Sequence, residues 1–177
     1  LKAEAVAVNK EFAKKMGIPQ SVAITCVKPS GTVSQLVDAA SGIHARHNPF
    51  YVRTVRGDKK DPLTKMMTDM GFPVEDDVMN PTQTAVFSFP MKVHDGAVFR
   101  TDMTAIEQLE LWLTYQKSWC EHKPSVTISV KEDEWMEVGA WVYKHFDWMS
   151  GVSFLPFSEH TYQQAPYQDT NKEGYEF

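Results

Sequence analysis

Short runs of apolar, mostly β-branched residues alternate along this chain with longer segments of helical periodicity, and this alternation is the strongest constraint on its fold. Strands that are almost continuously apolar are typical of sheets covered by helices on both faces. The order therefore predicts an α/β fold with parallel strands, and periodicity leaves open whether they form an open sheet or part of a barrel. The strand-like runs are 21–27, 50–55, 84–89, 125–130 and 152–155, and the helical patterns are 1–16, 33–40, 61–70, 104–122 and 132–146.

The ends of two helical segments carry specific signals. Gly17 follows the first segment and predicts a glycine cap at its C-terminus. Asp102 or Thr104 can cap the longest helix, and Pro124 stops it.

Length, composition and charge exclude several classes of protein. The chain has 177 residues, 42% hydrophobic and 23% charged, so it is globular and fits a single fragment, residues 1–177, with residues 155–177 as a surface tail. Its formal charge of −5 argues against nucleic acid as a partner. No run approaches the roughly 20 apolar residues of a membrane span. Two cysteines, Cys26 and Cys120, fit a reducing compartment, and we expect a cytoplasmic protein.

The most informative local feature is a turn that reads Lys-Pro-Ser-Gly-Thr-Val-Ser over residues 28–34, between a strand-like run and a helical segment. Free N–H groups at a helix start favour an anion, and Gly31 lets the backbone approach it closely. The hydroxyls of Ser30, Thr32 and Ser34 add further donors. The pattern predicts a phosphate cradle, with an ordinary Ser/Thr-capped helix start as the alternative. The spacing of a Walker loop is absent.

The other reactive side chains are interpreted as structural. Cys26 is read as a small apolar strand residue, and Cys120 lies on the apolar stripe of a helix. His44 and His47 are three residues apart, but no further ligand accompanies them, so we expect no metal site.

The same histidines belong to the one basic cluster of an acidic chain. Arg46, Arg53 and Arg56 complete it. We interpret the cluster as a solvated loop and a strand edge, with a contribution to anion binding near residues 29–34 as the alternative.

Several segments occur in the same order as in a known family, the ribonucleotide reductases. They resemble the large, catalytic chain of these enzymes, and in particular its barrel in the adenosylcobalamin-dependent class II, triphosphate-reductase-like branch. The matching segments are 28–34, 41–44 (Ser-Gly-Ile-His), 49–53 (Pro-Phe-Tyr-Val-Arg), 124–130, 152–156 and 162–167.

This resemblance implies a fold and a binding site. The family fold is an α/β barrel, and this chain would be the C-terminal part of it, with alternating strands and helices. In the family, a loop of this type holds the phosphates of the substrate. Carried over, that role falls on Ser30, Gly31, Thr32, Val33 and Ser34.

The resemblance also implies an oxidoreductase that converts ribonucleotides to deoxyribonucleotides for DNA replication by radical chemistry. Its cofactor would be adenosylcobalamin, and its partners would be the rest of the reductase chain and a thioredoxin-like reductant. The family's Asn-x-Cys-x-Glu motif, the source of the thiyl radical, has no match around Cys26 or Cys120. We therefore expect no catalytic residue and no assignable cobalamin contact in this chain, and an inactive isolated fragment. Because the chain begins at Leu1 rather than Met, we expect it to be part of a longer protein.

Two other functions stay open at this point. The chain could be a stand-alone nucleotide- or phosphate-binding α/β domain without redox activity. It could also be an interaction module whose aromatic faces meet a partner chain. A monomer that binds nucleotide on its own would favour the first of these.

Overall fold

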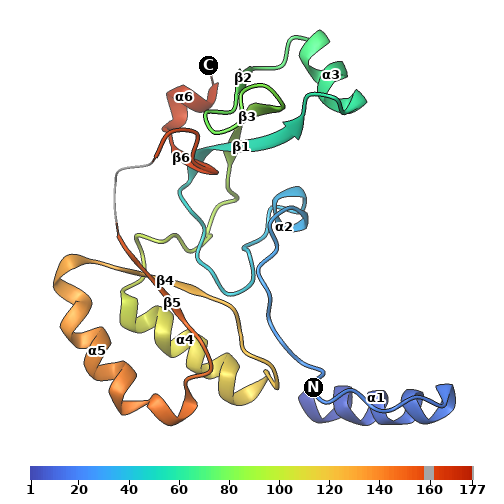
Figure 1. Cartoon of the computed structure of the whole chain (residues 1–177). Coiled ribbons are helices and arrows are strands. Elements are labelled where there is room, and N and C mark those ends of the chain that lie inside the picture. The colour runs from blue at the N-terminus through green and yellow to red at the C-terminus, as the bar shows by residue number, and fades with distance from the viewer. Residues whose placement is uncertain (158–161, 177) are drawn as a thin grey trace. The chain divides into compact units, whose positions relative to one another are not determined.

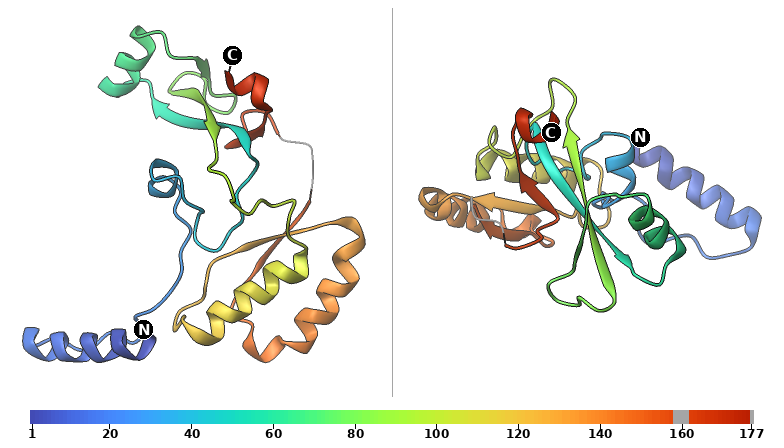
Figure 2. Two further views of the ribbon diagram at one scale, coloured as in Figure 1. Left: turned by 180° about the vertical axis from the view of Figure 1, so that it is seen from behind. Right: turned by 90° about the horizontal axis from the view of Figure 1, so that it is seen from above.

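The computed structural model describes residues 1–157 and 162–176, which form two compact units (Figures 1 and 2). Unit 1 contains residues 1–45 and 100–157, and unit 2 contains residues 46–99 and the described residues from 162 onward. Each unit is therefore built from segments that lie far apart in the sequence.

Unit 1 combines helices with one pair of parallel strands. The strands β4 and β5 pair from Thr127 with Ser153 to Val130 with Pro156. Figure 1 shows α4 and α5 side by side, next to these strands. The elements are α1 (Lys2–Met16), α2 (Val33–Leu36), α4 (Ala105–Ser118), β4 (Thr127–Val130), the 3-10 turns η1 (Glu132–Glu134) and η2 (Phe146–Trp148), α5 (Trp135–Lys144) and β5 (Ser153–Pro156).

The core of unit 1 lies where α4 packs against β4 and α5. Leu109 and Trp112 of α4 and Ile128 of β4 are completely buried. The indole N–H of Trp112 donates to the carbonyl of Pro124 at 3.0 Å, which satisfies the one polar atom of this large side chain. The parallel pair and its covering helices agree with the α/β prediction for this part of the chain.

Unit 2 is a four-stranded antiparallel sheet with the strand order β2-β3-β1-β6. Its longest pairing joins β1 and β3, from Phe50 opposite Lys92 to Asp58 opposite Thr84. The elements are β1 (Phe50–Asp58), α3 (Pro62–Asp69), β2 (Val74–Asp76), β3 (Thr84–Lys92), β6 (Tyr167–Asp169) and α6 (Lys172–Glu176).

The prediction of parallel pairing is wrong for unit 2. Ala85, Val86 and Phe87 are buried in succession, which gives β3 the continuous apolar run expected of a covered parallel strand. That run reports burial on both faces and carries no information about the direction of the neighbouring strand. The described strands lie in two separate sheets, and these sheets do not close into a barrel.

The strand predicted at 21–27 is also wrong, because this segment is irregular. Its backbone N–H and carbonyl groups form hydrogen bonds with side chains and with a turn, and not with a neighbouring strand. The Glu121 carboxylate accepts the N–H groups of Thr25 and of the residue before it. The indole of Trp119 donates to the carbonyl of Cys26 at 3.2 Å. A polar side chain thus takes the place of a strand ladder, which β-propensity does not reveal.

Most predicted helices are confirmed, with one much shorter than expected. The first helix ends in Gly17 at a φ of 68°, as its sequence indicates. Thr104, and not Asp102, caps α4. The helix expected over 33–40 ends at Leu36, and Asp38 has a φ of 49°, which turns the chain out of the helix.

Part of the predicted surface tail is built into the sheet of unit 2. Tyr167–Asp169 pairs with β1, and Gln164 and Ala165 are buried. Residues 158–161 and 177 of that tail lie outside the described residues. That this chain forms the C-terminal part of a barrel stays a prediction. Within the described part of the chain, no helix combines the length and the apolar character needed to cross a membrane.

Candidate functional site

The predicted phosphate loop is a tight turn closed by two serines of unit 1. The Ser30 hydroxyl accepts the backbone N–H of Ser34 at 3.0 Å, and the Ser34 hydroxyl donates back to the Ser30 carbonyl. Ser34 is buried, whereas Gly31, Thr32 and Val33 are exposed. The five predicted residues therefore lie close together and play two different roles. The two serines close the turn, and the three residues between them form its exposed side.

The second segment of the family resemblance, residues 41–44, forms a platform under this turn. The Ser41 hydroxyl accepts the backbone N–H of Ser30 at 2.9 Å. Gly42 has a φ of 63°, and a Cβ atom there would lie 3.1 Å from the carbonyl oxygen of Lys28. Only glycine suits both the left-handed backbone and this close approach. Two segments that were noted separately in the sequence are thus one structural unit.

His44 connects the platform to strand β4. Its Nδ1 atom lies 2.7 Å from the carbonyl oxygen of Ser41, and its Nε2 atom accepts the backbone N–H of Thr127 at 3.1 Å. The histidine that was considered as a metal ligand is therefore engaged with backbone groups at both ring nitrogens. The described residues contain no group of three His, Cys, Asp or Glu side chains suited to a metal ion.

Donors remain on the open side of the turn. Within the described residues, the backbone N–H groups of Thr32 and Val33 form no hydrogen bond, and neither does the Thr32 hydroxyl. Such groups lie at a helix start, where an anion can accept from them. Because α2 has only four residues, its dipole is small, and binding would depend on these individual donors.

The predicted basic cluster is divided between the two units. His44 belongs to unit 1, whereas the three arginines belong to unit 2. Arg53 donates to the carbonyl of Pro166 at 3.1 Å, and Arg56 forms an ion pair with Asp77 at 2.9 Å. These guanidinium groups are engaged inside unit 2, so the contacts favour the structural interpretation of the cluster.

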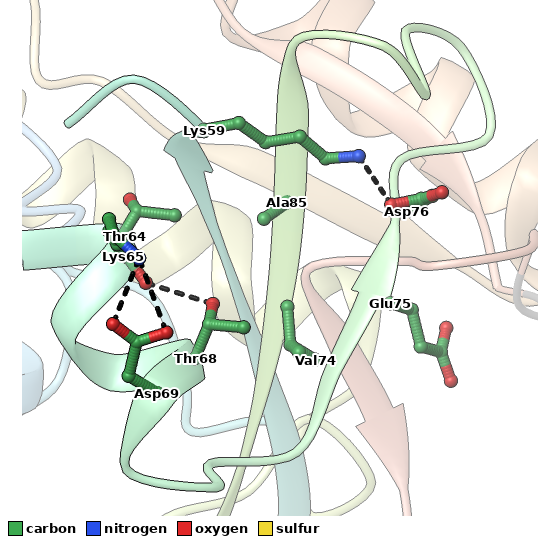
Figure 3. Close-up of a pocket in the computed structure, with 9 residues that line it drawn as sticks. All are labelled: Lys59, Thr64, Lys65, Thr68, Asp69, Val74, Glu75, Asp76 and Ala85. Carbon is green, nitrogen blue, oxygen red and sulfur yellow. Dashed lines mark hydrogen bonds and ion pairs between the residues drawn. The ribbon is translucent and has the colours of Figure 1, made fainter.

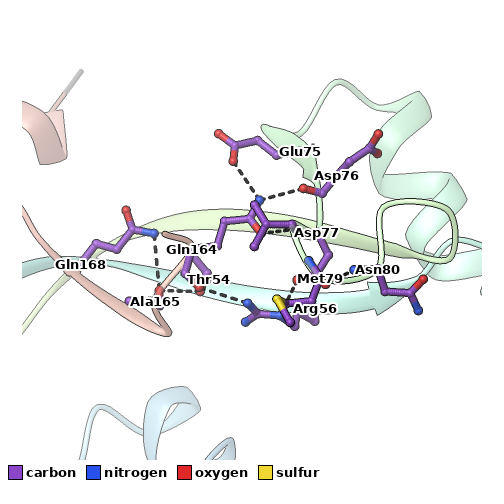
Figure 4. Close-up of polar contacts among 11 residues, drawn as sticks. Thr54, Arg56, Glu75, Asp76, Asp77, Met79, Asn80, Gln164, Ala165 and Gln168 are labelled. Carbon is purple, nitrogen blue, oxygen red and sulfur yellow. Dashed lines mark hydrogen bonds and ion pairs between the residues drawn. The ribbon is translucent and has the colours of Figure 1, made fainter. Parts of the chain in front are cut away.

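Sequence reasoning missed a polar network in unit 2 that is centred on Gln164 (Figure 4). The Gln164 amide accepts the N–H of Val78 at 2.9 Å and donates to the carbonyl of Asp76 at 2.8 Å. Its own carbonyl accepts from Arg56 at 3.2 Å. Gln164 belongs to the segment 162–167, which was noted for its resemblance to the family. Its hydrogen-bond partners, however, lie 86 to 108 positions away in the sequence, so no local pattern reveals them.

Asp77 completes this network, and its surroundings shift the pKa of its carboxyl group. Its carboxylate accepts from the Arg56 guanidinium and from the backbone N–H groups of Met79 and Asn80. Burial alone would raise the pKa of Asp77, but these hydrogen bonds and the positive charge of Arg56 together lower it below its ordinary value. The carboxylate is therefore held in its charged form as a structural group.

Three of the cavities have volumes of about 650, 360 and 610 Å³, in the range of sites for drug-sized molecules. The largest lies between α3 and the β2–β3 strands, where Lys59 pairs with Asp76 and Lys65 with Asp69 (Figure 3). Adenosylcobalamin, the cofactor implied by the resemblance, is much larger than a drug-sized molecule. None of these three cavities, at about 360 to 650 Å³, has the volume to enclose it.

Neither cysteine lies in the element predicted for it, because the segment 21–27 is irregular and α4 ends at Ser118, before Cys120. Cys120 is buried, and Cys26 is half-buried. Burial raises the pKa of the Cys120 thiol, which disfavours the reactive thiolate.

No protein-family model matches the chain. Among curated proteins, an adenosylcobalamin-dependent ribonucleoside-triphosphate reductase of Euglena gracilis is 33% identical over 162 residues, which is 90% of this chain and 22% of that protein. A Dictyostelium discoideum protein, named as a probable reductase of the same kind, is 31% identical over 176 residues, with coverage of 95% and 23%.

A solved structure gives the same result. The crystal structure of a B-12 dependent (class II) ribonucleotide reductase has a TM-score of 0.80 and 27% identity, and the match covers 99% of this chain and 25% of that chain. The chain thus spans about a quarter of the length of the proteins it matches. Sequence and structure agree that this chain is a relative of the adenosylcobalamin-dependent, class II ribonucleotide reductases.

Proposed function

We propose that the chain is part of an adenosylcobalamin-dependent ribonucleotide reductase, and that residues 30–34 bind the phosphates of its ribonucleotide substrate. The observation that carries the phosphate assignment is the joint geometry of the two family segments. Ser41 holds the N–H of Ser30 at 2.9 Å, while the N–H groups of Thr32 and Val33 stay available. Homology to reductases over 90–95% of the chain supports the wider function.

In this proposal, phosphate oxygens accept from the N–H groups of Thr32 and Val33 and from the Thr32 hydroxyl. Hydrogen bonds to an ionised acceptor are shorter and stronger than those between neutral groups. Ser30 and Ser34 fix the turn and do not contact the ligand through the groups they already use. The chain's contribution to catalysis is the placement of the substrate, since an enforced orientation lowers the entropic part of the barrier.

The radical chemistry belongs to the rest of the enzyme. When bound there, the cofactor supplies the radical from which the reaction starts, and a thioredoxin-like reductant returns the electrons. The whole enzyme is proposed to be cytoplasmic, and the elements described here to form the C-terminal part of its barrel. Because no Asn-x-Cys-x-Glu motif occurs in the sequence, the isolated chain should not reduce ribonucleotides. Measurable reduction by the purified chain would contradict this.

The binding step can be tested on the chain itself with inorganic triphosphate as the probe. Replacing both Ser30 and Thr32 by Ala should weaken binding about tenfold or more in calorimetric titrations, since each change removes a hydroxyl from the turn. Thr82→Ala in unit 2 is a matched control, because its exposed hydroxyl contacts only Asn80. Equal affinity of the double variant and the control would count against the phosphate loop.

A further inference from the structure

His44 is held between two backbone groups that together indicate which of its ring nitrogens carries a proton. The N–H of Thr127 can only donate, so the Nε2 atom that faces it carries no proton. The carbonyl of Ser41 can only accept, so the Nδ1 atom beside it carries the proton and donates at 2.7 Å. Both contacts require the same neutral tautomer, with the proton on Nδ1.

This histidine is one link in a continuous series of hydrogen bonds. Thr127 donates to His44, His44 donates to the carbonyl of Ser41, and the Ser41 hydroxyl accepts from Ser30. Ser30 in turn accepts from Ser34 and so closes the phosphate loop. The series joins three segments that are separate in the sequence, and every member lies in unit 1.

The far end of the series is a strand with one buried face. Thr127, itself exposed, begins β4, and Ile128 and Val130 of this strand are 0% and 1% exposed. Buried strand residues that pack against a helix are among the least mobile parts of a fold. The loop at residues 28–34, by contrast, has three exposed residues in succession. His44 therefore connects a strand anchored in the core of unit 1 to the exposed loop.

We propose that His44 is a positioning residue for the phosphate loop. In the tautomer with the proton on Nδ1, His44 donates to the Ser41 carbonyl and so fixes the position of Ser41. The Ser41 hydroxyl then accepts the N–H of Ser30, which sets the orientation of the turn. The N–H groups of Thr32 and Val33 are thereby aimed at a phosphate of the nucleotide substrate. This role rests on the proposed function, but the tautomer and the order of the loop can be measured without any ligand.

Three substitutions separate the two contacts of His44. His44→Asn places an amide N–H near the position of Nδ1 and keeps the bond to Ser41. His44→Gln places an amide oxygen near the position of Nε2 and keeps the bond from Thr127. His44→Ala removes both. His122→Ala is the matched control, because His122 is an exposed histidine of the same unit and its ring forms no hydrogen bond within the described residues.

The first readout is ligand-free nuclear magnetic resonance of the ring nitrogens in neutral to mildly alkaline buffer. Nitrogen shifts of the Nδ1-protonated form are expected for His44, and a ring protonated on Nε2 would overturn the proposal. Amide exchange at Ser30 should become at least several-fold faster in His44→Ala and stay unchanged in His122→Ala. Unchanged exchange in His44→Ala would overturn it as well.

The second readout is affinity for inorganic triphosphate. His44→Ala should bind about five- to tenfold more weakly, and Asn and Gln should each restore part of the loss, because each restores one bond. If wild-type protein binds the probe and His44→Ala binds it equally well, the positioning role is wrong. If wild-type protein does not bind but the tautomer and exchange results hold, the positioning role stands as a property of the loop and the proposed function fails.

Discussion

At the residue scale, Gly42 tests whether the platform shapes the loop. Gly42→Ala should lower the free energy of unfolding by about 1–2 kcal/mol for the left-handed backbone, and by more because the new Cβ lies 3.1 Å from the carbonyl of Lys28. Gly17→Ala is the control, with a similar φ of 68° and open space around its Cβ position. Urea denaturation measures both. Equal losses would show that the contact with Lys28 does not matter.

Asp77 gives a prediction about pH. Its pKa is lowered in the folded state, so its stabilising effect is present above the unfolded pKa of about 3.9 and is lost as the pH falls through the folded pKa. Asp77→Asn should therefore lower the melting temperature at neutral pH and flatten its decline below about pH 4. Asp69→Asn, which removes only an exposed pair with Lys65, should leave the profile unchanged. A parallel decline in wild type and Asp77→Asn would refute the role of Asp77.

The same scale shows how much of the site the sequence could reveal. The turn at residues 30–34 could be predicted because its signal is local: serines four positions apart, one glycine and a helix start. The bond between Ser30 and Ser41 spans 11 positions, and no residue pattern specifies it. The bond from Arg56 to Gln164 spans 108 positions and depends on strand β6 pairing with β1. Such contacts follow from the tertiary fold, so a single sequence does not predict them.

At the element scale, α4 begins with a complete capping box. Thr104 accepts the N–H of Glu107, and the Glu107 carboxylate accepts the N–H of Thr104 at 2.8 Å. Thr104→Ala should reduce the free energy of unfolding by about 1 kcal/mol, because it leaves a helix N–H without its partner. Thr114→Ala, in the exposed middle of the same helix, should be neutral or slightly stabilising. Thermal denaturation of the pair tests this, and a larger loss for Thr114→Ala would contradict it.

Trp112 tests the packing of α4 on the rest of unit 1. Trp112→Phe keeps an aromatic ring but leaves the buried carbonyl of Pro124 without its donor. We expect a loss of about 2–4 kcal/mol from the unpaired carbonyl and the smaller ring. Trp148→Phe, at a half-exposed position, should change stability by less than about 0.5 kcal/mol. Urea denaturation measures both free energies of unfolding. If Trp112→Phe loses no more than Trp148→Phe, burial of Trp112 contributes little.

Helices were predicted better than strands for a physical reason. The cap at Thr104 and the glycine at residue 17 act within one helical turn, so their sequence signals are complete in themselves. A strand is defined by its neighbour, and the neighbour of β1 is β3 on one side and β6 on the other. The segment 21–27 has strand-like residues, but the Glu121 carboxylate and the Trp119 indole take up its backbone groups.

At the scale of the whole molecule, each unit is discontinuous in sequence. Ile43 packs in the core with Leu109 and Trp112, although the chain builds unit 2 between them. No single cut therefore separates the two units. The whole-chain composition therefore carries no information about a boundary between the units.

Exposed apolar surface on α1 predicts the state of the chain in solution. Val8, Phe12 and Met16 are 43%, 53% and 67% exposed, and Val8 and Phe12 line a mainly apolar cavity of about 610 Å³ with Ile24 and Trp119. Contiguous apolar surface of this kind drives association in water. The 20.1 kDa chain should therefore sediment as species larger than a monomer, increasingly so at higher concentration.

A substitution on α1 tests whether its exposed apolar surface, and not general instability of the fold, causes the association. Phe12→Ser should shift the sedimentation profile toward the monomer, since it removes the largest exposed ring of α1. Lys10→Ser, an exposed polar position of the same helix, should leave the profile as in wild type. Circular dichroism of both variants checks that the helices persist. A wild-type chain that is monomeric at every concentration would refute the association, and equal shifts in both variants would place its cause away from the Phe12 surface.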